Sequence, residues 1–187
     1  MFSPDSVGVQ HTLPPLISNE ALSRLLFRII PEEQLREIFT KNPYAECELS
    51  DEFLGFLQPY YALAHLIPPH WTIVDLGAAH SAQAWIYYFT GHQYLNVDSW
   101  PDMVPFHTPT SRHFAMTAGE FLTRHGHELN LKETFAICSY CPMWGEGTTE
   151  HIRRFFPNLF VYYPHGGPSP SLSRLTRSLS HTRREPT

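Results

Sequence analysis

The chain has 187 residues, of which 42% are hydrophobic and 14% aromatic, and this composition favours one globular domain over a disordered chain. A formal net charge of −5 gives no overall nucleic-acid-binding signature, and no apolar run approaches the ~18 residues of a membrane span. Three cysteines without a secretory leader predict a reducing, cytoplasmic location and no disulfide framework.

The N-terminal third predicts three helices. Ser18 is a candidate N-cap for the first, and Pro31 ends it and can begin the second. Ser50 begins the third, which Pro59 is expected to kink or break. The residues expected to face inward from these helices are Leu22, Leu25, Leu26, Ile29, Leu35, Ile38, Phe39, Phe53, Phe56, Leu57, Tyr60 and Ala64.

The most informative stretch runs from Thr72 to Trp85. The β-branched, mostly apolar run 72–76 predicts a buried central strand of a parallel sheet. It is followed by the small residues 77–79, Gly-Ala-Ala, which let a ligand approach the backbone closely. Ser81 is then a candidate helix N-cap. The expected inner face of that helix is Ala82, Trp85, Ile86 and Phe89.

A second strand is expected from Gln93 to Val97, and Asp98 closes it. Asp98 follows Gly77 by 98 − 77 = 21 residues. Nucleotide-binding βαβ units place a ribose-binding carboxylate about 20 residues beyond the glycine turn, because one helix and one strand lie between them. The spacing therefore makes Asp98 a candidate acceptor for ribose hydroxyl groups.

These residues together resemble the cofactor motif of class I S-adenosylmethionine-dependent methyltransferases. The run 74–79, Val-Asp-Leu-Gly-Ala-Ala, is similar to the DLGAAPGGW of RrmJ/FtsJ-like ribose methyltransferases. It departs from that pattern at His80 and Ser81, where the family has proline and glycine. The alternative interpretation is an ordinary βαβ unit of some other α/β protein.

The resemblance implies a fold and a cofactor. The fold is a Rossmann-like three-layer αβα sandwich, with a mainly parallel sheet of about five strands in the order 3-2-1-4-5. The cofactor is S-adenosyl-L-methionine. The residues that the resemblance assigns to the cofactor site are Asp75, Gly77, Ala78, Ala79, His80, Asp98, Ser99 and Thr117. For Thr117 there is a second explanation, because Thr117 and Glu120 match a helix capping box.

The remaining elements complete this organisation. Further strands are expected at 114–116, 135–138 and 159–163, and helices from Thr117 and from Thr149 to Phe156. The expected methyltransferase-like domain spans 18–165 with a helical cap at 18–69, between a flexible lead-in at 1–17 and a flexible basic tail at 166–187.

The loop after the fourth strand is expected to face the methyl group, because ligands bind beyond the carboxyl ends of parallel strands. Its acceptor-side candidates are Ser139, Tyr140, Cys141 and Trp144. The two aromatic rings could stack on a flat acceptor or cover the edge of the core. The lysine-aspartate-lysine-glutamate set of RrmJ-type enzymes is not matched, since Ser139 stands where its aspartate belongs when Pro142 is set on the motif's proline. RNA 2′-hydroxyl methylation is therefore not expected.

Cys138 and Cys141 form a Cys-x-x-Cys pair, and Cys138 is expected to be buried in the strand. The favoured interpretation is a structural role, with an activated Cys141 or half of a metal site as alternatives. No histidine spacing matches a known ligand set, so no metal is expected.

The leading hypothesis is a methyltransferase of atypical acceptor, in which aligning nucleophile, methyl and sulfur suffices without a strong base. The second hypothesis is a catalytically degenerate methyltransferase fold that serves as a binding or regulatory module, as the unmatched catalytic motifs suggest. A third is an α/β enzyme with Cys141 as nucleophile. The expected partner is the small-molecule cofactor, with no membrane partner and an unidentified acceptor.

Overall fold

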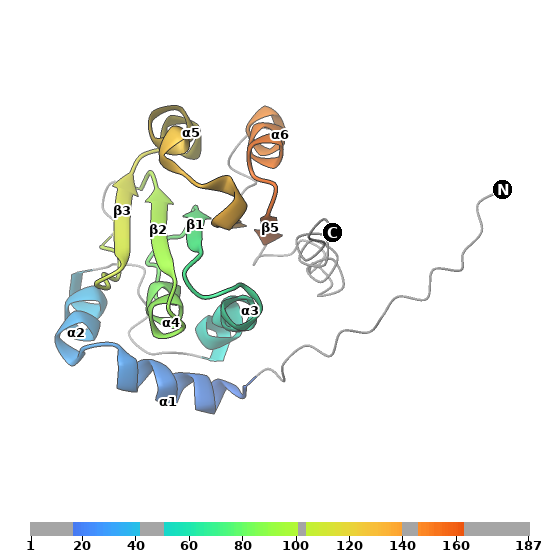
Figure 1. The fold of residues 1–187 in the computed structure, drawn as a ribbon. Coiled ribbons are helices and arrows are strands. Elements are labelled where there is room, and N and C mark those ends of the chain that lie inside the picture. Colours follow the sequence, from blue (N-terminus) through green and yellow to red (C-terminus); the bar gives the residue numbers. More distant parts are fainter. Residues whose placement is uncertain (1–16, 42–50, 101–103, 140–145, 163–187) are drawn as a thin grey trace, which may run out of the picture.

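A five-stranded sheet forms the middle of the protein (Figure 1). The computed structural model describes residues 17–41, 51–100, 104–139 and 146–162. The helices are α1 (Asn19–Ile29), α2 (Glu32–Lys41), α3 (Asp51–Leu66), α4 (Gln83–Phe89), α5 (Ala118–His125) and α6 (Glu146–Phe155). The strands are β1 (Thr72–Leu76), β2 (Gln93–Asp98), β3 (Ser111–Ala115), β4 (Thr134–Ser139) and β5 (Leu159–Tyr162). Short 3-10 turns, η1 (Gly126–Glu128) and η2 (Leu131–Glu133), connect α5 to β4.

The strands lie in the order β3-β2-β1-β4-β5, and every neighbouring pair is parallel. The predicted Rossmann-like α/β class and the predicted order are therefore confirmed. β3 begins at Ser111, earlier than the predicted Phe114. It pairs with β2 from Tyr94 beside Ser111 to Asp98 beside Ala115, and this ladder decides where β3 starts and ends.

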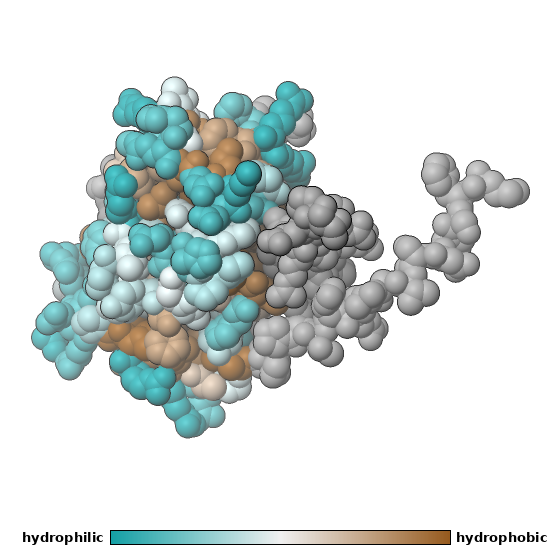
Figure 2. Space-filling view, viewed as in Figure 1, coloured by the Kyte–Doolittle hydropathy of each residue, from teal (hydrophilic) through white to brown (hydrophobic). Residues whose placement is uncertain are grey.

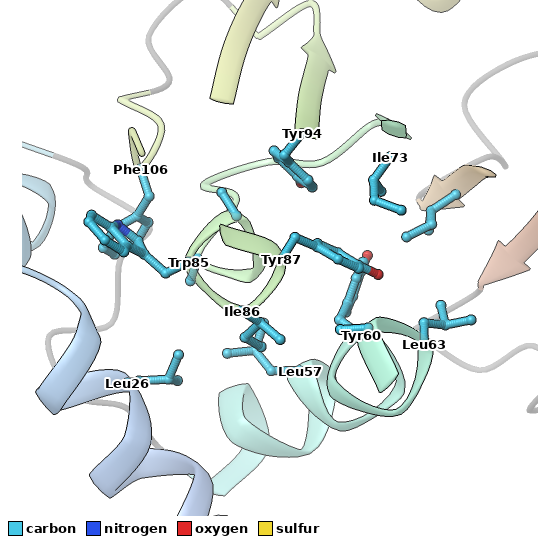
Figure 3. Packing of buried hydrophobic residues seen from close by; sticks show 14 of the residues in the cluster. Leu26, Leu57, Tyr60, Leu63, Ile73, Trp85, Ile86, Tyr87, Tyr94 and Phe106 are labelled. Carbon is cyan, nitrogen blue, oxygen red and sulfur yellow. The ribbon is translucent and has the colours of Figure 1, made fainter. Parts of the chain in front are cut away.

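Helices cover both faces of the sheet and give the predicted three layers (Figure 1). α5 and α6 lie against one face, where Phe121 and Ile152 belong to a buried cluster with Val74 of β1. α3 and α4 lie against the other face, with α1 outside them. A second and larger cluster fills that side and includes Tyr60 and Tyr94 (Figure 3).

The outermost helix, α1, begins and packs as predicted. The Ser18 hydroxyl accepts a hydrogen bond from the Ala21 amide at 3.2 Å, and Leu22 and Leu26 are fully buried. Its outer face exposes Phe27, and Figure 2 shows a hydrophobic patch near α1 on a mostly hydrophilic face. Among the described helices, none combines the length and apolarity needed to cross a membrane.

α4 is buried on nearly all sides, whereas the sequence predicted one inner face. Its buried residues, with the residue before it, are Ala82, Gln83, Ala84, Trp85, Ile86 and Tyr87. Phe89 was expected to face inward but is exposed, so that prediction is wrong. The reason is tertiary: α4 lies between the sheet and the helices α1 and α3, and only its last turn reaches solvent.

α3 runs from Asp51 to Leu66 without a break at Pro59, so of the predicted kink or break, the break is wrong. A proline inside a helix removes one backbone hydrogen bond and costs about 3 kcal/mol. Buried Leu57 precedes Pro59, and buried Tyr60 and Leu63 follow it. Because the core holds both halves of α3, burial offsets the local cost of the proline.

Gln34 of α2 ties the N-terminal helices to the rest of the domain. Its side-chain amide donates to the His107 carbonyl at 2.8 Å, and its Oε1 accepts from the His107 amide at 3.1 Å. The same Oε1 accepts from Trp85 Nε1 at 2.7 Å. Residues 104–110, which lie between β2 and β3, contain no helix. The helix that lies beside the start of β3 is α2, from the N-terminal part of the chain (Figure 1). One side chain therefore joins α2, α4 and this irregular segment.

Gln34→Ala should lower the free energy of unfolding by about 1–3 kcal/mol, because it leaves the buried Trp85 indole N–H and the His107 backbone without partners. Thr40→Ala on the exposed side of the same helix is the matched control and should stay within about 0.5 kcal/mol of wild type. Urea denaturation measures both. Equal changes in the two variants would show that the hydrogen bonds of Gln34 contribute no measurable stability.

Candidate functional site

The strand pairing brings the ends of three strands to one edge of the sheet. Leu76 of β1 lies between Val97 of β2 and Cys138 of β4 in the ladder. Gly77, which follows β1, and Asp98, which ends β2, therefore lie at the same edge of the sheet. β1 and β4 are also neighbours at the point where the strand order reverses, which is where open α/β sheets bind ligands.

The turn after β1, residues 77–81, has an unusual backbone. Gly77, Ala79 and Ser81 have φ angles of +78°, +50° and +60°, in the left-handed region. Such angles cost little at glycine but about 1–2 kcal/mol at residues with a Cβ. The Gly77 amide donates to the Val97 carbonyl at 2.8 Å, which anchors the turn to β2. A turn of this kind persists only if its surroundings hold it.

Ser81 is not the helix N-cap that the sequence predicted. Helix α4 begins two residues later at Gln83, and an N-cap requires an extended backbone that Ser81 does not have. Its hydroxyl instead donates to the Ala79 carbonyl at 3.1 Å and accepts from the Asn96 side-chain amide. Ser81 stands where the RrmJ/FtsJ pattern has glycine, and its left-handed backbone is one that glycine adopts without cost.

Asp98 connects the ends of β1 and β2. One carboxylate oxygen accepts from the Ala79 amide at 2.9 Å, and the other accepts from the Trp100 amide at 2.8 Å. The side chain is half-buried. Two carboxylate oxygens offer about four acceptor positions, so two remain for hydroxyl groups of a ligand. Asp98 therefore anchors the turn, and its carboxylate can still accept hydrogen bonds from a ligand at this edge of the sheet.

Asp75 lies beneath the turn rather than on its surface. It is fully buried, and its Oδ2 accepts from Gln83 Nε2 at 2.9 Å and from the Tyr94 hydroxyl at 2.7 Å. The Gln83 amide donates also to the Ala78 carbonyl at 3.2 Å. This geometry favours support of the turn over direct contact between Asp75 and a ligand.

Two histidines flank Asp98. Burial lowers the pKa of His80 below its ordinary value, while the negative charge of Asp98 opposes this shift. Burial likewise lowers the pKa of His113, and His107 lowers it further, while Asp98 again opposes. His113 Nδ1 is buried and lacks a hydrogen-bond partner among the described residues, so a protonated ring would bury an unpaired donor. Both imidazoles therefore favour the neutral form.

The other predicted cofactor contacts lie along the rim of this edge. Ser99 is exposed directly after Asp98, and Trp100 follows with about half of its surface exposed. Thr117 is exposed and forms the predicted capping box: its hydroxyl accepts from the Glu120 amide at 3.2 Å, and Glu120 accepts from the Thr117 amide at 2.9 Å. The capping interpretation of Thr117 is confirmed, and a cofactor contact stays a prediction.

The acceptor-side candidates are only partly described. Ser139 ends β4 at the same edge as the turn, whereas its side chain, Tyr140, Cys141 and Trp144 lie outside the described residues. Cys138 is fully buried, as predicted, and is disulfide-bonded, contrary to the expectation of no disulfide framework. In the described part of the chain, no group of three or more His, Cys, Asp or Glu residues could hold a metal ion.

Four residues of this edge were missed by the sequence analysis: Gln83, Tyr94, Asn96 and Trp100. Gln83 and Asn96 are polar residues inside otherwise apolar buried elements, and that mismatch could have marked them. Tyr94 looks like an ordinary strand aromatic, and only the strand register reveals its hydroxyl beneath the turn. Trp100 belongs to no sequence motif, and only the hydrogen bond from its amide to Asp98 marks it.

The chain matches no protein-family model and no curated protein. It is similar to the structure of a candidate type II methyltransferase from Anaeromyxobacter dehalogenans, with a TM-score of 0.43 and 13% identity over 66% of this chain and 54% of that one. This chain thus spans about half the length of that protein. It is also similar to the plantazolicin methyltransferase BpumL in complex with SAH, with a TM-score of 0.41 and 11% identity over 89% and 69% of the two chains. At this level of likeness, any function has to be argued from the residues of this chain.

Ser81→Ala should destabilise the protein more than Ser81→Gly, by about 1 kcal/mol. Both variants lose the hydrogen bonds of the hydroxyl, but only glycine releases the left-handed strain at φ +60°. Thermal or urea unfolding compares the two. Greater stability of the alanine variant, as at an ordinary surface position, would contradict the strained conformation.

The protein should lose stability as pH falls below about 6.5, the ordinary histidine pKa. His80 and His113 have folded-state pKa values below that of the unfolded chain, so the unfolded state binds protons first and is stabilised relative to the folded state. Urea titrations at about pH 7.5 and 5.5 test this. A His80→Gln, His113→Gln double variant should show a shallower decline, and an identical slope would exclude these two groups.

Proposed function

We propose that this edge binds S-adenosyl-L-methionine and that the chain is a methyltransferase of unidentified acceptor. The observation that carries the proposal is the hydrogen bond from the Ala79 amide to Asp98, which places a carboxylate directly beside a small-residue turn. The turn lies at the switch point of a parallel sheet, where nucleotide-like ligands bind. The resemblance of residues 74–98 to class I methyltransferases, closest to the RrmJ/FtsJ type, adds the identity of the cofactor.

Each part of the cofactor has a candidate partner. Gly77, Ala78 and Ala79 present backbone to the amino-acid portion, with His80 beside them. Asp98 would accept hydrogen bonds from the ribose hydroxyls with the lone pairs that Ala79 and Trp100 leave available. Ser99 and Thr117 stand on the adenine side. Asp75 would act from below by supporting the turn.

Trp100 is an addition to the sequence-based set. Its backbone amide donates to Asp98, so its position is tied to the ribose-binding carboxylate. The residue is 45% exposed at the same rim, which suits stacking of its indole ring against a flat ring of a bound ligand. We therefore place Trp100 beside Ser99 on the adenine side of the proposed site.

The bound cofactor would supply an activated methyl group, and the protein would supply alignment. Ser139 at the end of β4, followed by Tyr140, Cys141 and Trp144, would form the acceptor side, because β4 is the neighbour of β1 at this edge. Alignment of nucleophile and methyl group alone accounts for a large part of such a rate enhancement. The described residues of the site contain no lysine, so a strong general base is not part of the proposal.

Asp98→Asn should weaken the binding of S-adenosylhomocysteine by about 1.5–3 kcal/mol, the range for hydrogen bonds to a charged group, or about 10- to 150-fold. Asparagine keeps one oxygen that can accept from the Ala79 amide, but its NH2 group replaces the oxygen that accepts from the Trp100 amide, so urea denaturation must first show that the variant is folded. Glu133→Gln removes the same charge at an exposed and distant position and is the control. Isothermal calorimetry measures all three proteins.

Unchanged affinity in a folded Asp98→Asn variant would contradict the ribose contact. Failure of the wild-type protein to bind either S-adenosylmethionine or S-adenosylhomocysteine would remove the cofactor from the proposal altogether. Binding without transfer of a labelled methyl group to any fraction of a lysate would favour the non-catalytic binding module.

A further inference from the structure

A buried hydrogen-bond network lies directly under the turn at residues 77–81. Gln83, the first residue of α4, donates from one side-chain nitrogen both to Asp75 Oδ2 at 2.9 Å and to the Ala78 carbonyl at 3.2 Å. Its side chain therefore bridges a strand carboxylate and the backbone of the turn. Gln83 is 1% exposed and Asp75 is fully buried, so water does not compete for these bonds.

Tyr94 of β2 completes the network from the neighbouring strand. Its hydroxyl donates to the same Asp75 Oδ2 at 2.7 Å, and the residue is fully buried. Burial raises the pKa of the Tyr94 hydroxyl well above its ordinary value, and the charge of Asp75 raises it further. The hydroxyl therefore stays protonated at neutral pH and remains a donor.

The neighbouring Tyr87 provides a natural comparison. Its ring stacks on that of Tyr94 with 5.6 Å between centroids and 18° between planes (Figure 3). It too is fully buried and has a pKa raised by burial. Its hydroxyl, however, has no hydrogen-bond partner among the described residues. Two stacked tyrosines thus differ mainly in whether the hydroxyl reaches Asp75.

We propose that Gln83 and Tyr94, acting through Asp75, are positioning residues that fix the ligand-binding conformation of the turn. The turn holds two non-glycine residues, Ala79 and Ser81, at left-handed angles, so it needs support from several sides. Asp98 and Asn96 hold its outer part through Ala79. Gln83 holds the Ala78 carbonyl from inside. The effect on ligand affinity rests on the proposed function, whereas the effect on the turn does not.

The first measurement is calorimetry with S-adenosylhomocysteine. Tyr94→Phe and Gln83→Met should each weaken binding about three- to tenfold, because a loosened turn must be ordered again on binding. Tyr87→Phe removes a buried hydroxyl of the same kind without breaking a bond of the network, and should stay within about twofold of wild type. Equal losses in the two tyrosine variants would overturn the proposal.

The second measurement needs no ligand and is amide hydrogen exchange. The Ala79 amide donates to Asp98 and the Ser81 amide to the Ala78 carbonyl, so both report on the turn. They should exchange faster in Tyr94→Phe and Gln83→Met than in Tyr87→Phe. The Ala136 amide, bonded to Asn158 across the β4–β5 side of the sheet, is the internal reference for general loss of stability.

The two measurements separate the claims. If wild-type protein does not bind S-adenosylhomocysteine, the proposed function fails, and hydrogen exchange alone decides the positioning role. Selective acceleration at Ala79 and Ser81 in either variant that folds supports that role. Unchanged exchange at both amides, or acceleration no greater than at Ala136, would overturn it.

Discussion

The hydrogen bond between the Ala79 amide and the Asp98 carboxylate is the contact on which the candidate site depends. It joins the turn after β1 to the end of β2, and α4 lies between these two segments in the chain. Without it, the left-handed backbone at Ala79 would lose its main external partner. The same carboxylate accepts a hydrogen bond from the Trp100 amide. One side chain therefore fixes the positions of the turn, of the end of β2 and of the start of the segment that follows it.

Burying polar groups under this turn has a free-energy cost that the structure offsets with specific partners. Asp75 is taken out of water and receives hydrogen bonds from Gln83 and from Tyr94. Asn96 uses its amide on Ser81 and Ala79. These residues lie in the layer between the sheet and α4, where an apolar core would pack at least as well. Their presence there is explained by the turn that they hold.

The N-terminal helices take part in the same arrangement. α1 and α3 cover α4, and α2 reaches the segment before β3 through Gln34. That segment passes over the turn as well, since the Phe106 amide donates to the His80 carbonyl at 2.8 Å. The helical layer is therefore continuous with the candidate site. Its packing is one reason why α4, which carries Gln83 at its start, is buried on nearly every side.

The sequence alone determined that the five strands exist, the Gly77–Asp98 spacing and the capping box at Thr117, because alternation, periodicity and caps are local properties of a chain. The strand order was implied only by the resemblance to the methyltransferase family, and the strand pairing confirms it. Only the tertiary structure decided that Ser81 is left-handed rather than a helix cap and that α4 is buried on nearly all sides except at its last turn. It also decided that Asp75 meets Gln83 and Tyr94. Those outcomes depend on which residues of distant strands and helices come into register, and no local pattern encodes that.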